Sequence, residues 1–169
     1  IIHNEYLFKY EKNMSKINTF RVVNLNYNNN ANRIEDETFH FGGDSTLLSL
    51  QNGGGKTVLV QMLIAPFVHR RYRNTTDRTF QSFFTSSKPT FLLTEWALDG
   101  GAGYVLTGMM VRKSQGDAEA NETEDLDIIT FIHEYKGQNE YDIQSFPLIE
   151  NDGKQKKLKK PNEITYTKR

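Results

Sequence analysis

Leu50-Gln51-Asn52-Gly53-Gly54-Gly55-Lys56-Thr57 is the stretch from which the fold of this chain is predicted. The apolar run Thr46 to Leu50 precedes it and has the length of a buried strand. The largely apolar segment Val58 to Arg73 follows it and reads as a buried helix. A strand, a glycine-rich loop and a helix that opens with Gly-Lys-Thr form the context of a phosphate-binding loop, or P-loop.

The residue types in this loop suit the binding of a nucleoside triphosphate. Glycines let backbone N–H groups close around phosphate oxygens, and a helix N-terminus adds unsatisfied donors and the positive end of its dipole. We therefore expect Asn52-Gly53-Gly54-Gly55-Lys56-Thr57 to bind the nucleotide. Lys56 would bridge the β- and γ-phosphates, and the hydroxyl of Thr57 would be a Mg²⁺ ligand.

The loop departs from the full P-loop pattern at one position. G-x-x-x-x-G-K-[ST] requires glycine where this chain has Leu50. The three glycines at 53–55 keep the part that surrounds the phosphates flexible, so we interpret the departure as a variation. The alternative is a glycine-rich turn that leads into a core helix, with Lys56 merely solvated.

Composition excludes several classes of protein. The chain has 169 residues and no cysteine, so a disulfide-stapled secreted mini-protein is excluded. No apolar stretch has the length of a transmembrane helix, and no signal peptide is recognisable at the start. Its 21 Lys and Arg balance 21 Asp and Glu, which gives no overall attraction to nucleic acid. We expect a cytoplasmic protein.

The rest of the chain reads mainly as strands and turns. Runs of β-branched and aromatic residues predict strands at Ile17–Leu25, Ile34–Phe41, Pro89–Leu98, Tyr104–Arg112 and Ile128–Tyr135. Phe146–Glu150 and the turn Asn151-Asp152-Gly153 predict a further hairpin. Pro66 is expected to distort the end of the helix. The predicted fold class is α+β or α/β, with mixed and antiparallel strands around the P-loop helix.

Three segments resemble the heads of SMC-type ABC ATPases, the coiled-coil ATPases of bacterial chromosome segregation, DNA repair and plasmid defence. Asn52-Gly53-Gly54-Gly55-Lys56-Thr57 resembles their Asn-Gly-x-Gly-Lys-[Ser/Thr] loop. Ile17-Asn18-Thr19-Phe20-Arg21 is similar to the first strand of the head, and Pro89–Lys113 to its antiparallel meander. The resemblance implies a P-loop NTPase fold, namely the N-terminal lobe of an ABC-type head over residues 14–169. Residues 1–13, either a leader or an added segment, are left unassigned, and the chain would be a fragment of a longer protein.

The resemblance also implies a function. In such heads the signature motif, the Walker B carboxylates and the switch histidine lie in a C-terminal lobe, so this chain would be a half-site for ATP and Mg²⁺ with no catalytic residue of its own. ATPase activity would belong to the full-length protein, and this chain alone would be inactive or slow. The implied partners are the C-terminal lobe, a second head in a homodimer, DNA and accessory subunits, with no membrane. Arg21 would lie near the nucleotide phosphates, although it is equally compatible with a solvent-facing strand residue.

Two other functions remain open from the sequence. Phe91-Leu92-Leu93-Thr94-Glu95 imitates a Walker B strand, which would suit a compact P-loop kinase-like phosphotransferase, although Glu95 also fits an ordinary strand. A non-enzymatic interaction module with a vestigial P-loop is the other alternative. Two basic clusters, Arg70–Arg73 and Lys154–Lys160, each suit contacts with phosphates. The alternative for Arg70–Arg73 is a basic helix end, and the alternative for Lys154–Lys160 is a solvated hairpin. The four histidines show no metal-ligand spacing.

Overall fold

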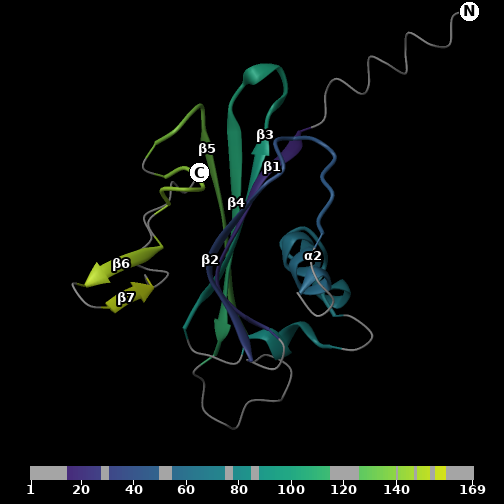
Figure 1. Ribbon diagram of the computed structural model, residues 1–169, viewed down its shortest axis with the longest axis vertical. Helices are drawn as coiled ribbons and strands as arrows, with labels where there is room; N and C mark the ends of the chain where they lie inside the picture. The colour runs from purple at the N-terminus through teal and green to yellow at the C-terminus, as the bar shows by residue number, and fades with distance from the viewer. Residues whose placement is uncertain are drawn as a thin grey trace, which may run out of the picture.

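An antiparallel sheet of five strands, in the order β2-β1-β3-β4-β5, is the main element of the computed structural model (Figure 1). The structure describes residues 15–27, 31–49, 55–74, 78–84, 88–114, 126–139, 141–146, 148–152 and 155–158. The strands of this sheet are β1 Lys16–Tyr27, β2 Asn32–His40, β3 Thr90–Ala97, β4 Tyr104–Lys113 and β5 Leu126–Tyr135. β6 Ile149–Asp152 pairs with β7 Gln155–Leu158 in a separate hairpin.

Helical structure in the described residues is limited. The helix α2 spans Lys56–Ile64, and short 3-10 helices occur at Arg70–Tyr72, Phe80–Phe83 and Asp99–Gly101. The predicted helix extended to Arg73, but α2 ends before Pro66, which lacks an N–H and clashes with the preceding turn. The expected distortion at Pro66 is therefore confirmed, and the helix is shorter than the sequence indicated.

The predicted fold class is wrong. Every neighbouring pair of strands in the five-stranded sheet is antiparallel, and a single α-helix of the described chain lies against it, so this is a mostly β structure. It is not an α/β P-loop fold with helices flanking a parallel sheet, and this finding overturns the predicted ABC-type head lobe as a fold class. Five of the predicted strands coincide closely with β1 to β5, so their positions are confirmed.

The strand predicted at Thr46–Leu50 does not form in the described residues of that run. Residues 45–49 are in neither helix nor strand, Leu47 is 92% exposed, and Leu50 lies outside the described residues. β1 already pairs with β2 on one side and with β3 on the other. The apolar run therefore has no place beside β1, and residues 45–49 are irregular.

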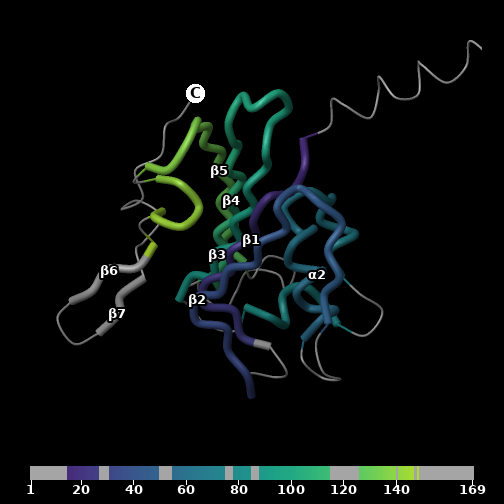
Figure 2. The backbone as a smooth tube through the Cα atoms, turned by 45° about the horizontal axis from the view of Figure 1, so that its top comes forward, coloured from purple at the N-terminus to yellow at the C-terminus, as the bar shows by residue number. Residues whose placement is uncertain are grey.

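The two faces of the sheet are covered by different parts of the chain (Figure 2). Side chains alternate between the faces along a strand. On one face α2 packs through Leu59 and Met62 against a cluster that includes Phe20 and Val22. On the other face residues 141–146 and 148 cover a second cluster, to which Val23 contributes. We call these the helix face and the turn face.

Candidate functional site

The candidate site is the N-terminus of α2. Gly55 precedes the helix with φ 83° and ψ 15°, a left-handed conformation that favours glycine. The amide of Leu59 donates the first helical hydrogen bond to the carbonyl of Gly55, at 2.9 Å. Lys56 and Thr57 therefore occupy the first turn, where backbone amides have no acceptor within the helix. The other predicted site residues, Asn52, Gly53 and Gly54, lie outside the described residues.

The charges at this helix end favour an anion. No acidic residue lies in the first turn of α2, and no side chain of the described residues caps it. Lys56 adds a positive charge beside the positive end of the helix dipole, and both attract an anion. The side chain of Lys56 is half-buried and that of Thr57 is exposed, so both are accessible to a ligand.

Buried contacts fix the position of α2. Leu59 and Met62 are buried against the helix face, and the side chain of Gln61 is 7% exposed. Gln61 Nε2 donates to the carbonyl of Arg73 at 2.6 Å, and Arg73 Nε donates to the carbonyl of Ala65 at 3.0 Å. These contacts join the end of the helix to the segment that follows it. A helix held in this way presents its N-terminus in a defined orientation.

Of the arginines that follow α2, Arg73 contacts the helix end. Arg73 binds the Ala65 carbonyl, which the end of the helix leaves without a helical partner. Burial, with a smaller effect from the charge of Arg70, lowers the pKa of Arg73 below its usual value. The guanidinium of Arg71 lies over the ring of Tyr72, 4.6 Å from its centroid. For Arg73, these contacts agree with the alternative in which the basic cluster binds carbonyls at the end of the helix.

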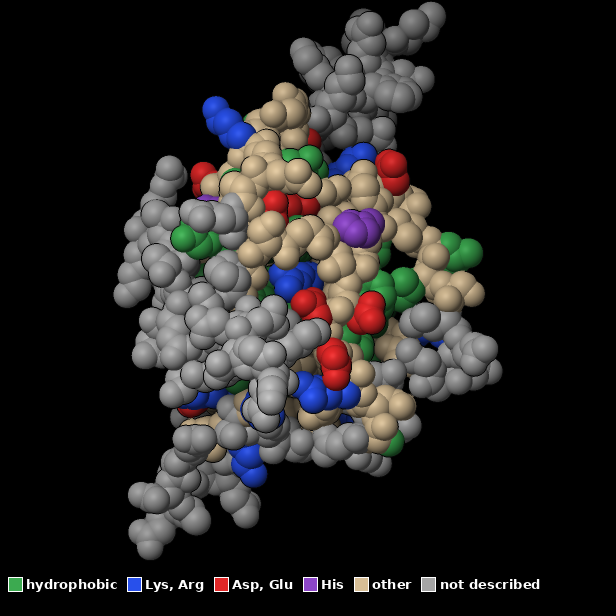
Figure 3. Space-filling view, turned by 60° about the vertical axis from the view of Figure 1, so that its left-hand side comes forward, with side chains coloured by type: hydrophobic (Ala, Val, Ile, Leu, Met, Phe, Trp, Pro, Cys, Tyr) green, Lys and Arg blue, Asp and Glu red, His purple; other side chains and the backbone are tan. Residues whose placement is uncertain are grey.

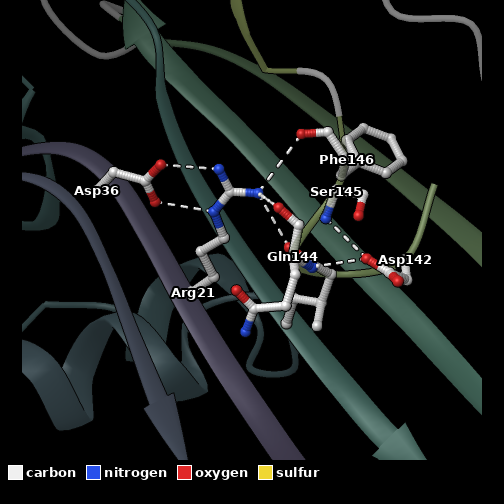
Figure 4. A network of polar contacts seen from close by, with 7 residues as sticks. Arg21, Asp36, Asp142, Gln144, Ser145 and Phe146 are labelled. Carbon is white, nitrogen blue, oxygen red and sulfur yellow. Dashed lines mark hydrogen bonds and ion pairs between the residues drawn. The ribbon is translucent and has the colours of Figure 1, made fainter. Parts of the chain in front are cut away.

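Arg21 lies on the turn face, away from α2 (Figure 4). Its Nε and Nη2 atoms each donate to a carboxylate oxygen of Asp36 at 2.8 Å. Its Nη1 donates to the carbonyls of Ile143 at 3.0 Å and Gln144 at 2.9 Å. The residue is 7% exposed. The structure therefore does not bring Arg21 together with Lys56, because its guanidinium holds the turn segment against the sheet.

Asp142 shapes the same turn. Its carboxylate accepts hydrogen bonds from the amides of Asn139 at 3.1 Å, Gln144 at 3.0 Å and Ser145 at 2.7 Å. Burial alone would raise the pKa of Asp142, but these hydrogen bonds outweigh burial and lower it. In the space-filling view of Figure 3, acidic and basic side chains lie close together near the middle of the molecule.

Glu95 is also on the turn face, and it is buried at 6% exposure. Its carboxylate accepts a hydrogen bond from Asn18 Nδ2 at 2.6 Å and another from the hydroxyl of Tyr135. That hydroxyl accepts from the amide of Ile143 at 3.2 Å. Burial and the bond to Glu95 raise the pKa of Tyr135 above its usual value. Glu95 is therefore an ordinary buried strand residue and does not face the start of α2.

Sequence reasoning missed the polar contacts of the turn face. Arg21 and Ile143 are 122 positions apart, and Glu95 and Tyr135 are 40 apart, so no local pattern connects them. Within the described ranges, no group of three or more His, Asp or Glu is placed to hold a metal. No helix in those ranges has the length and apolar character needed to cross a membrane. Of the basic run 154–160, residues 154, 159 and 160 lie outside the described residues.

Comparisons with family models, curated proteins and solved structures found no match to this chain. The chemistry of its own residues is therefore the basis for a function.

Proposed function

We propose that this chain binds ATP with Mg²⁺ through Asn52–Thr57, at the N-terminus of α2. The observation that carries the proposal is the left-handed Gly55 directly before a helix that opens with Lys56 and Thr57. This geometry puts the first-turn helix amides, an ammonium group and a hydroxyl at one end of a well-anchored helix. Triphosphate and Mg²⁺ need these groups together.

Each residue has a distinct role in the proposal. The amides at 53–57 bind phosphate oxygens, and Gly55 allows the backbone to approach them without a Cβ. Lys56 neutralises charge on the β- and γ-phosphates, and the exposed hydroxyl of Thr57 binds Mg²⁺. Arg21 is left out, because its guanidinium is held by Asp36 and by carbonyls on the opposite face.

The proposed activity belongs to a larger assembly. The resemblance of the loop to SMC-type ATPases supports a half-site in a cytoplasmic ATPase that acts on DNA. Hydrolysis would then require a C-terminal lobe and a second head, and this chain alone would bind nucleotide with little or no turnover. This part of the proposal rests on the motif at 52–57 and not on the fold.

The kinase-like alternative is weaker in view of where Glu95 lies. A compact P-loop kinase needs a carboxylate near the metal at the start of the P-loop helix. Glu95, the residue that the sequence offered for this role, is bound to Tyr135 and Asn18 on the turn face. A vestigial loop that binds no nucleotide remains an outcome that the binding experiment distinguishes.

Titration of the chain with a fluorescent ATP analogue tests the proposal. We expect saturable, Mg²⁺-dependent binding by the wild type. Lys56→Ala should weaken it about 10- to 150-fold, since a charge-assisted hydrogen bond contributes about 1.5–3 kcal/mol. Lys136→Ala, which removes an exposed lysine after β5, is the matched control and should leave the affinity unchanged. Equal affinities for wild type and Lys56→Ala, or no saturable binding, would contradict the proposal.

A further inference from the structure

The two edge strands of the five-stranded sheet differ in the side chains that they expose to solvent. β2 and β5 each pair with a single strand of that sheet, β1 and β4 respectively. The side chains of Ile128 and Ile132 on β5 are 37% and 61% exposed, although isoleucine is usually buried. Both lie on the helix face. Ile128 pairs with Val111 of β4, which belongs to the helix-face cluster, and Ile132 is four residues along the same strand. An exposed apolar edge strand is a site at which another strand can pair.

The charges of β2 oppose its pairing with a copy of itself about the middle of the strand, whereas β5 has no run of like charges at its middle. The acidic residues Glu35, Asp36 and Glu37 are consecutive on β2 and all exposed. Antiparallel self-pairing about Asp36 would place Glu35 opposite Glu37, which is destabilising. The acids of β5 are Asp127 and Glu134, which lie near its opposite ends.

We propose that two copies of this chain pair through β5, antiparallel, about a two-fold axis at Thr130. In this register Ile128 of one copy lies opposite Ile132 of the other, and this pair occurs twice. Asp127 lies opposite His133, a carboxylate facing a hydrogen-bond donor. Leu126 and Glu134, at the two ends of the strand, lie opposite each other and are the mismatched pair. The two exposed isoleucines cover each other across the interface.

Neighbouring registers match less well. Paired residues must share a face, so a symmetric shift moves the axis to Ile129 or to Phe131. An axis at Ile129 places the carboxylate of Asp127 opposite Phe131. An axis at Phe131 places Ile128 opposite the carboxylate of Glu134. Of the three, the axis at Thr130 is the one that places the two exposed isoleucines, Ile128 and Ile132, opposite each other.

The proposed interface is separate from the nucleotide site. α2 packs against a cluster built on β1, β3 and β4, including Phe20, Leu92 and Met109, whereas the interface is the outer edge of β5. Pairing would continue the sheet from one copy into the other and keep both α2 helices on the same face. We therefore expect dimers without nucleotide, so that failure of this proposal leaves the proposed function intact.

The mass of the full chain in solution is the first test. Light scattering should give twice the monomer mass of 19.5 kDa. Ile132→Lys should shift the chain to monomer, because a lysine on an edge strand opposes pairing. Ile64→Lys is the matched control, since it places a lysine at an isoleucine of α2 that is 44% exposed, and it should remain dimeric. A monomeric wild type, or a dimer that Ile64→Lys breaks and Ile132→Lys does not, would overturn the proposal.

Cysteine cross-linking tests the register, because the chain has no cysteine of its own. Thr130→Cys places two thiols opposite each other at the axis, within the Cα separation of about 4.4–6.8 Å that a disulfide needs. Mild oxidation should give a covalent dimer rapidly. Ile132→Cys should cross-link slowly, since its opposite residue is Ile128. Faster cross-linking of Ile132→Cys than of Thr130→Cys would rule out this register.

Discussion

The two faces of the sheet use their polar groups in opposite ways. On the turn face, Arg21, Asp142 and Tyr135 all form hydrogen bonds within the chain, and together they fix the turn segment. On the helix face, α2 begins with a left-handed glycine and no side-chain cap, and Val60 and Ile64 on its outer side are 51% and 44% exposed. The difference indicates that polar contacts stabilise the turn face, whereas the helix face carries the nucleotide site that we propose.

The largest expected effect comes from breaking the turn face at Arg21. Arg21→Ala leaves Asp36 and the buried turn carbonyls without their donor. Each charge-assisted hydrogen bond contributes about 1.5–3 kcal/mol, so loss of several should cost roughly 3–5 kcal/mol of unfolding free energy. Arg112→Ala is the control, because its ion pair with Asp127 is partly exposed, and it should cost about 1 kcal/mol or less. Urea unfolding measures both variants. Equal losses would mean that the turn face does not hold the fold.

A smaller effect is expected at Tyr135. Tyr135→Phe removes a donor to the buried Glu95 and an acceptor of the Ile143 amide, which should cost about 1–3 kcal/mol. The raised pKa of Tyr135 also predicts a pH dependence. Above the unfolded pKa of about 10, the unfolded tyrosine releases its proton while the folded one keeps it. The unfolding free energy of the wild type should therefore fall as pH rises past this value.

Comparison with Tyr135→Phe isolates that pH dependence. The variant lacks the phenol, so its unfolding free energy should fall less steeply above the same pH. Parallel curves for the two proteins would show that the hydroxyl of Tyr135 titrates in the folded chain as it does in the unfolded one.

The smallest effect is expected on the helix face. Val60→Thr keeps the β-branched shape at a position that is 51% exposed, so the unfolding free energy should change by about 0.5 kcal/mol or less. Thermal unfolding followed through Trp96, the sole tryptophan of the sequence, is a suitable measurement. The ring of Trp96 lies 5.1 Å from that of Phe67, just beyond α2. A loss as large as that of Tyr135→Phe would remove the contrast between the two faces.

Local patterns in the sequence predicted the parts of the fold that depend on local chemistry. The β-branched and aromatic runs located β1 and β5, and Pro66 marked where the helix fails. The strand at Thr46–Leu50 was wrong because an apolar pattern does not reveal whether the run pairs with a neighbouring strand. The fold class was wrong for a related reason, since the direction of each strand depends on its partner and not on its own residues.

The candidate site was predicted only as far as its motif. Gly55, Lys56 and Thr57 stand at the start of α2, as the Gly-Lys-Thr sequence indicated. Arg21 was assigned to the same site, but its contacts with Asp36 and with residues more than a hundred positions away place it on the turn face. No local pattern in the sequence indicates contacts between residues so far apart.

Amide hydrogen exchange with and without ATP and Mg²⁺ tests the central claim most directly. The amides of Lys56, Thr57 and Val58 have no acceptor within the helix and should exchange more slowly when nucleotide is bound. The turn segment Ile143–Phe146 should exchange at an unchanged rate. Protection of the turn segment, or no protection at the start of α2, would contradict the account.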